Sequence, residues 1–114
     1  MAESMERSGL HVEGSNDRHA IVHLLVRHGI DYDTTPWAPS LPEIRPIGSC
    51  EQVLAGMETA VMTSTGRVIG FVLDADSPLA DRWNAVRDRL YRVGIAVPNL
   101  PQPRGFIGES PRYK

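Results

Sequence analysis

The most constraining feature of the sequence is a nearly unbroken apolar run at residues 68–73, which ends in Asp74-Ala75-Asp76. A strand that does not alternate between apolar and polar residues is covered on both faces, and this is typical of a parallel sheet flanked by helices. The run therefore predicts a central parallel strand and a fold of the α/β class.

The N-terminal third of the chain predicts a strand followed by a helix. Residues 9–14 alternate and end in Glu13-Gly14, which favours a short strand and a tight turn. Ser15-Asn16-Asp17 then supplies cap residues and a first-turn acid for a helix at residues 17–28. Gly29 follows as a natural end of that helix.

The middle of the chain predicts a loop, a short strand and a second helix. Residues 31–46 hold four prolines, which remove backbone donors and disfavour a long regular element. We expect only a short strand near Glu43–Ile47 in this segment. Ser49 is placed to cap a helix at residues 50–62, whose apolar face contains Val53, Leu54, Met57 and Val61.

A third helix follows the apolar run. Ser77 can cap it, Pro78 suits its first position, and Gly94 is a natural end. Its inward face is predicted to contain Leu79, Trp83, Val86, Leu90 and Val93. Residues 95–97 can add another short strand. The complete pattern predicts a small, mostly parallel sheet flanked by about three helices.

Composition is that of one globular domain. The chain has 114 residues, of which 41% are hydrophobic and 23% charged. We expect a single domain over residues 1–114, with a flexible tail at 1–8 and a Pro/Gly-rich segment at 98–114. No stretch approaches the roughly 20 apolar residues that span a bilayer, and one cysteine excludes an internal disulfide and a multi-cysteine metal site. The sequence therefore predicts a soluble cytoplasmic protein.

Charge is distributed unevenly along the chain. Residues 1–80 carry five arginines and eleven acids, whereas residues 81–114 carry seven basic and three acidic residues. The corresponding net charges are -6 and +4, within a whole-chain charge of -2. This asymmetry suits a molecule with both a cation site and a phosphate-contacting surface. A solvated helix face plus a basic tail is the plainer interpretation.

Three carboxylates follow predicted strands. Glu13 ends the first strand, and Asp74 and Asp76 follow the apolar run. In parallel α/β sheets, ligands bind beyond the carboxyl ends of the strands. Crowded carboxylates repel one another, and a divalent cation relieves that repulsion; oxygen ligands of this kind suit Mg²⁺ or Mn²⁺. The alternative is that Glu13 favours a helix N-terminus and the two aspartates are turn and cap residues.

The same residues resemble a known family. "HVEGSND" at 11–17 together with "GFVLDAD" at 70–76 resembles the Toprim domain of topoisomerases, bacterial-type primases and nucleases of the overcoming-lysogenization-defect type. The stretches "DADSPLADRWNAVRDRL" and "VPNLPQPRGFIG" are similar to a Toprim-related prokaryotic subgroup of unknown function. The resemblance covers about Leu10 to Gly108.

The resemblance implies Mg²⁺-dependent chemistry on nucleic-acid phosphodiesters. Asp74 and Asp76 would hold the metal, and Glu13 would hold metal or transfer a proton. Topoisomerase strand passage is not expected from a chain of this size. Members of the subgroup continue with further strands and another acidic segment, so the resemblance also implies that this chain is C-terminally truncated.

Several other side chains have a chemical and a plainer interpretation. Arg82 and Arg89 share a face of the third helix and can contact phosphates or keep that helix solvated. His19 and His23 have a spacing that can bind zinc, although a solvated helix face is the favoured interpretation. His11 is expected to pack or to face solvent, and Cys50 to be buried.

Two further functions compete with the nuclease-type hydrolase. The first is an inactive or truncated Toprim-like domain that binds a partner protein such as an ATPase. The second is an aspartyl-phosphate phosphatase, because "VLDADS" at 72–77 also resembles the opening motif of haloacid dehalogenases. That motif normally opens its fold and has a downstream lysine, whereas the only lysine here is Lys114.

Overall fold

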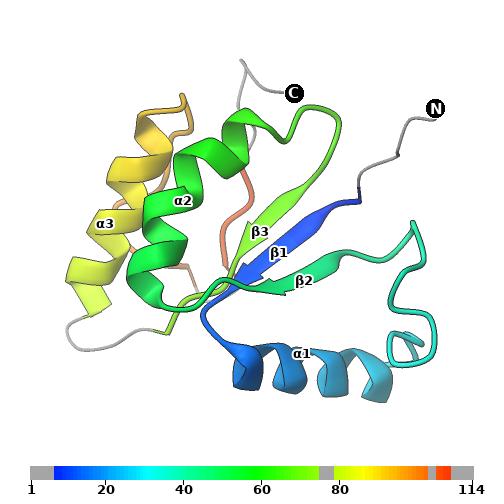
Figure 1. Cartoon of the computed structure of the whole chain (residues 1–114). Helices are drawn as coiled ribbons and strands as arrows, with labels where there is room; N and C mark the ends of the chain where they lie inside the picture. The colour runs from blue at the N-terminus through cyan, green and yellow to red at the C-terminus, as the bar shows by residue number, and fades with distance from the viewer. Residues whose placement is uncertain (1–6, 75–78, 103–104, 109–114) are drawn as a thin grey trace. The chain divides into compact units, whose positions relative to one another are not determined.

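The structure is a computed structural model that describes residues 7–74, 79–102 and 105–108. Strands and helices alternate along the chain (Figure 1). The elements are β1 (Gly9–Val12), α1 (Ser15–Arg27), β2 (Glu43–Pro46), α2 (Cys50–Met62), β3 (Ile69–Phe71) and α3 (Leu79–Tyr91). This order confirms the predicted α/β class. None of the described helices is both long and apolar enough to cross a membrane.

The three strands form a parallel sheet in the order β2-β1-β3. His11 of β1 aligns with Arg45 of β2 on one side and with Phe71 of β3 on the other. The prediction that the 68–73 run is parallel is confirmed, but the prediction that it is central is wrong for the described strands, among which β1 occupies the centre. Only residues 69–71 of the run pair as a strand, and the flanking Val68 and Val72 are exposed.

The described residues form two compact units. The first contains the sheet, α1 and the start of α2: residues up to Val53 together with Arg67–Leu73. Its core is a cluster of three buried side chains, Val12, Tyr32 and Ile44. Partly buried apolar residues pack against this cluster; they are Leu10, Ile21, Val22, Leu25 and Leu41. Helix α1 thus contributes a half-buried apolar stripe to the first unit, and none of its residues is fully buried.

The second unit contains Leu54–Gly66 and the described residues from Asp74 onward. Its buried apolar side chains come from α2 and from the end of α3 and the segment after it; they are Met57, Ala60, Val61, Leu90, Val93 and Ile95. Arg89 donates a hydrogen bond to the Leu54 carbonyl at 3.2 Å, and Arg92 forms an ion pair with Glu58 at 3.1 Å. These contacts join α3 to α2.

The helix ends follow local signals in the sequence. Gly29 and Gly94 have φ near +85°, and each is followed by a residue whose N–H bonds to a carbonyl five residues back. Both glycine ends were predicted. Ser49 caps α2 as predicted, since its Oγ accepts a hydrogen bond from the Gln52 N–H at 3.1 Å.

Other local predictions differ from the structure. Helix α1 begins two residues earlier than expected, so that Gly14 is its N-cap, and the Asp17 carboxylate accepts the Gly14 N–H at 3.0 Å. Residues 95–97 do not form a strand. Leu79 is 47% exposed rather than inward-facing. Ser77 and Pro78, the predicted start of α3, lie outside the described residues.

Candidate functional site

The candidate site starts from the carboxyl edge of the sheet, where all three parallel strands end. Backbone pairing continues past the strands at this edge. The His11 carbonyl accepts the Val72 N–H at 3.0 Å, and the Glu13 carbonyl accepts the Gly48 N–H at 2.8 Å. The backbone of Glu13 is therefore bonded to the segment that follows β2, and the backbone of His11 to the residue that follows β3.

Glu13 lies in the tight turn between β1 and α1 and is half-buried. The neighbouring loop from β2 to α2 is close-packed at Gly48, whose φ is +136°. A Cβ at that position would clash with Oε1 of Gln52. A compact loop with a left-handed glycine therefore runs beside the Glu13 turn.

The structure describes only one of the two aspartates. Asp74 is exposed and comes three residues after Phe71, the last residue of β3. It belongs to the second compact unit, whereas Glu13 belongs to the first. Asp76 lies outside the described residues. Within the part of the chain that the structure describes, no three His, Cys, Asp or Glu side chains gather as metal ligands. The site of three carboxylates therefore stays a prediction.

His11 occupies the centre of the sheet, two residues before Glu13. Its ring packs edge-on against Phe71, with ring centroids 5.4 Å apart. Burial lowers the pKa of the His11 imidazole and the charge of Arg45 lowers it further, while Glu43 acts in the opposite direction. Of the two placements expected for His11, packing and solvent exposure, the structure shows packing, and this environment favours the neutral imidazole.

The predicted phosphate-contacting arginines are both partly buried on α3. Arg89 donates to the Leu54 carbonyl and so supports the contact between α3 and α2. One terminal nitrogen of Arg82 is buried. Sequence spacing placed these residues on one helix face, but the bond from Arg89 to Leu54 joins positions 35 residues apart and has no local signal.

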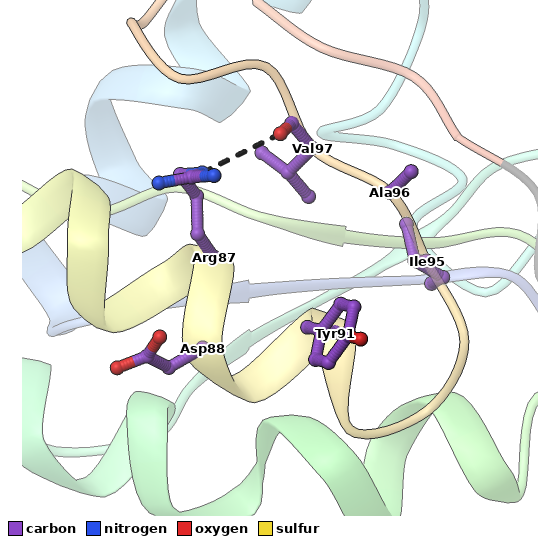
Figure 2. Close-up of a pocket in the computed structure, with 6 residues that line it drawn as sticks. All are labelled: Arg87, Asp88, Tyr91, Ile95, Ala96 and Val97. Carbon is purple, nitrogen blue, oxygen red and sulfur yellow. Dashed lines mark hydrogen bonds between the residues drawn. The ribbon is translucent and has the colours of Figure 1, made fainter.

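A pocket of about 270 Å³ lies between α3 and the segment that follows it (Figure 2). Its lining comes from Arg87, Asp88, Tyr91, Ile95, Ala96 and Val97. Arg87 holds one wall in place, because its Nε donates to the Val97 carbonyl at 3.4 Å and its Nη2 donates to Oδ1 of Asn99 at 2.7 Å. This pocket was not predicted from the sequence. Gly94 was the feature that could have indicated it, because the chain turns back along α3 there.

The structure also places the remaining candidates. His19 and His23 are exposed on α1, and Cys50 is buried at the start of α2. Trp83 is half-buried, and its indole N–H donates to the Pro98 carbonyl at 2.8 Å.

Comparison with known families assigns the chain to one of them. The family described as a protein of unknown function, DUF3226, matches residues 7–114. The chain belongs to the DUF3226 family. No curated protein and no solved structure matches it significantly. The DUF3226 description names no activity, so the resemblance of this DUF3226 protein to Toprim domains stays a prediction.

Proposed function

We propose that this DUF3226 protein is a Toprim-like enzyme with Mg²⁺-dependent phosphoryl-transfer activity, of the nuclease type, on nucleic acid. One observation supports the proposal above all: β1 and β3 are adjacent and parallel. Glu13 follows β1 directly, and Asp74 and Asp76 follow β3. The order along the chain therefore puts the three carboxylates directly after two neighbouring parallel strands, and the proposal rests on that order.

The donor set fits a hard divalent cation. Carboxylate oxygens are the ligands that Mg²⁺ and Mn²⁺ prefer, and a cation bound there would offset the charge that develops on a phosphate oxygen during transfer. In this proposal Asp74 and Asp76 hold the cation. Glu13 either completes the ligand set or holds a proton at its carboxylate. Asp74 is exposed and so accessible to a substrate from solvent.

Arg82 is the residue that we assign to the substrate phosphate, on α3 a few residues after the aspartates. Arg89 shares its helix face, but its bond to the Leu54 carbonyl gives it a structural role as well. A nucleic-acid substrate implies a cytoplasmic location, which is part of this proposal.

A second candidate function is binding to a protein partner such as an ATPase. The edges of the sheet differ in a way that favours it. Edge strand β2 carries Glu43, Arg45 and Pro46, which discourage pairing with another strand. Edge strand β3 has no charge or proline, and exposed valines flank it on both sides. Among the described strands β3 pairs only with β1, which is typical of an edge that accepts an added strand.

The first experiment is calorimetric titration of Mn²⁺ and of Mg²⁺ into the full chain. Asp74→Asn/Asp76→Asn and Glu13→Gln are the test variants. Asp31→Asn/Asp33→Asn is the matched control, because it removes the same charge at the same spacing from exposed loop positions. We expect saturable binding that the first variant abolishes, that Glu13→Gln weakens and that the control leaves unchanged.

Activity is then measured on end-labelled DNA and RNA, with Mg²⁺ and with a chelator. Cleavage that needs both the cation and the aspartate pair would support the enzyme. Absence of cation binding by the folded protein would refute the metal site and favour the partner-binding function. In that case size-exclusion chromatography and thermal unfolding test the partner-binding function, since a stable monomer with a cooperative melt would argue against it.

A further inference from the structure

Helix α1 presents two imidazoles on one face. It runs without interruption over Ser15–Arg27, and His19 and His23 lie four residues apart within it. Residues at this spacing are neighbours on a helix surface, with Cβ atoms about 5–6 Å apart. Both side chains are exposed, so that an ion in solvent has access to them.

The ring nitrogens of this pair are available. Among the described residues, neither the His19 nor the His23 imidazole takes part in a hydrogen bond, an ion pair or a ring contact. His11 differs, because it is half-buried against Phe71 in the sheet. His28 lies beyond the end of the helix and is five residues from His23, so it does not share the face of the pair.

We propose that His19 and His23 form a two-imidazole site for a divalent transition-metal ion of the class that prefers nitrogen ligands, namely Zn²⁺, Ni²⁺ or Cu²⁺. Neutral imidazole is the commonest protein ligand of these ions, and two imidazoles one helical turn apart can direct a nitrogen to the same ion. Water completes the coordination.

The chemistry of this site separates it from the proposed carboxylate site. Nitrogen ligands favour Zn²⁺, Ni²⁺ and Cu²⁺, whereas oxygen ligands favour Mg²⁺ and Mn²⁺. Arg27 is the nearest cation along the same stripe, one turn beyond His23. Arg27 is exposed, and solvent and salt screen its repulsion of a bound ion.

The test is calorimetric titration of Ni²⁺ and of Zn²⁺ into the untagged full chain. His19→Ala and His23→Ala remove one ligand each. The matched control is His23→Ala/Ala20→His, which keeps the number of histidines but moves one imidazole off the face, because adjacent helix residues do not face each other. Ala20 is exposed, so the helix tolerates the change. Circular dichroism verifies that every variant is folded.

We expect one Ni²⁺ or Zn²⁺ per chain in the wild type and loss of that binding in both single variants and in the repositioned variant. Asp74→Asn/Asp76→Asn should bind Ni²⁺ as the wild type does. Equal binding by the repositioned variant would overturn the proposal, as would no binding by the wild type. Loss of Ni²⁺ binding in the aspartate variant alone would also overturn it, by assigning the ion to the carboxylates.

Discussion

Removing the hydroxyl of Tyr32 tests whether its two hydrogen bonds stabilise the first unit. Tyr32 is 2% exposed, and its hydroxyl donates to the Pro42 carbonyl at 2.7 Å and accepts from the Ile44 N–H at 3.2 Å. Tyr32→Phe removes the hydroxyl and keeps the ring. The Pro42 carbonyl retains a hydrogen bond from Arg7 Nη2 at 3.0 Å, but the buried Ile44 N–H loses its partner.

The expected cost follows from that unpaired donor. A buried N–H without a partner costs about 1–3 kcal/mol. In a domain of this size 1 kcal/mol lowers the melting temperature by roughly 4 °C, so the variant should melt about 4–12 °C below the wild type. Packing of the ring in the core, and the Arg18 guanidinium 5.9 Å from its centroid, should be retained.

The assay is thermal and urea unfolding followed by circular dichroism. Tyr91→Phe is the matched control, because Tyr91 is 78% exposed and the same deletion there should change stability by less than about 0.5 kcal/mol. The dependence of the unfolding free energy on urea concentration should be the same in all three proteins, since unfolding exposes the same core. If Tyr32→Phe melts together with Tyr91→Phe, the hydroxyl does not stabilise the loop and the reasoning is wrong.

Three further predictions concern stability. Met57 is fully buried in α2, so Met57→Ala should lower the free energy of unfolding in urea by about 2–5 kcal/mol. An effect no larger than that of the same change at the exposed Met62 would show that the core is loosely packed. Gly48→Ala should cost about 1–3 kcal/mol, because its φ of +136° strains any side chain and its Cβ would displace Gln52; unchanged melting would refute this. The lowered pKa of His11 means that the folded state takes up fewer protons than the unfolded state, whose histidine pKa is near 6.5. The contribution of neutral His11 to the free energy of unfolding should be complete above about pH 6.5 and should be lost as the pH falls through the folded-state pKa. His11→Phe should weaken this pH dependence in melts between pH 5 and 8, roughly the range of histidine titration.

Elements with local signals were predicted well. Helix α2 has the predicted bounds because Ser49 is a side-chain cap, and both left-handed glycines end their helices as predicted. The start of α1 was placed late because the capping partner of Asp17 is the backbone N–H of Gly14 and not a polar side chain. The sequence contains no feature that favours glycine over serine at that position.

Features that depend on distant pairing were not predicted. The apolar run around β3 shows that both its faces can be covered, but the choice of central strand depends on which strand finds a partner on each side. The loop at residues 31–42 was predicted only as irregular. In the structure Arg7 donates to the Leu41 and Pro42 carbonyls, and Tyr32 bonds across to β2. These contacts span 10 to 35 residues and leave no periodic pattern.

The candidate carboxylate site shows the same division. Glu13 and the aspartates were predicted to follow strands, and the structure shows that the strands before Glu13 and Asp74, β1 and β3, are adjacent and parallel. Assembly of the three side chains into one site stays a prediction, because Asp76 lies outside the described residues. The single-domain and Toprim predictions also stay predictions.

The two proposed metal sites can be separated by ligand chemistry without a substrate. If both exist, Mn²⁺ binding depends on Asp74 and Asp76 and ignores His19 and His23, while Ni²⁺ binding shows the reverse dependence. If only the carboxylate site exists, Ni²⁺ binding is weak and unaffected by the histidine variants. If only the imidazole pair exists, Ni²⁺ binds and Mn²⁺ does not. The exposed valines that flank β3 would then be the best support for a function, namely binding to a partner chain. These three cases therefore differ in which ion binds and in which variant abolishes the binding, and binding of neither ion would refute both sites.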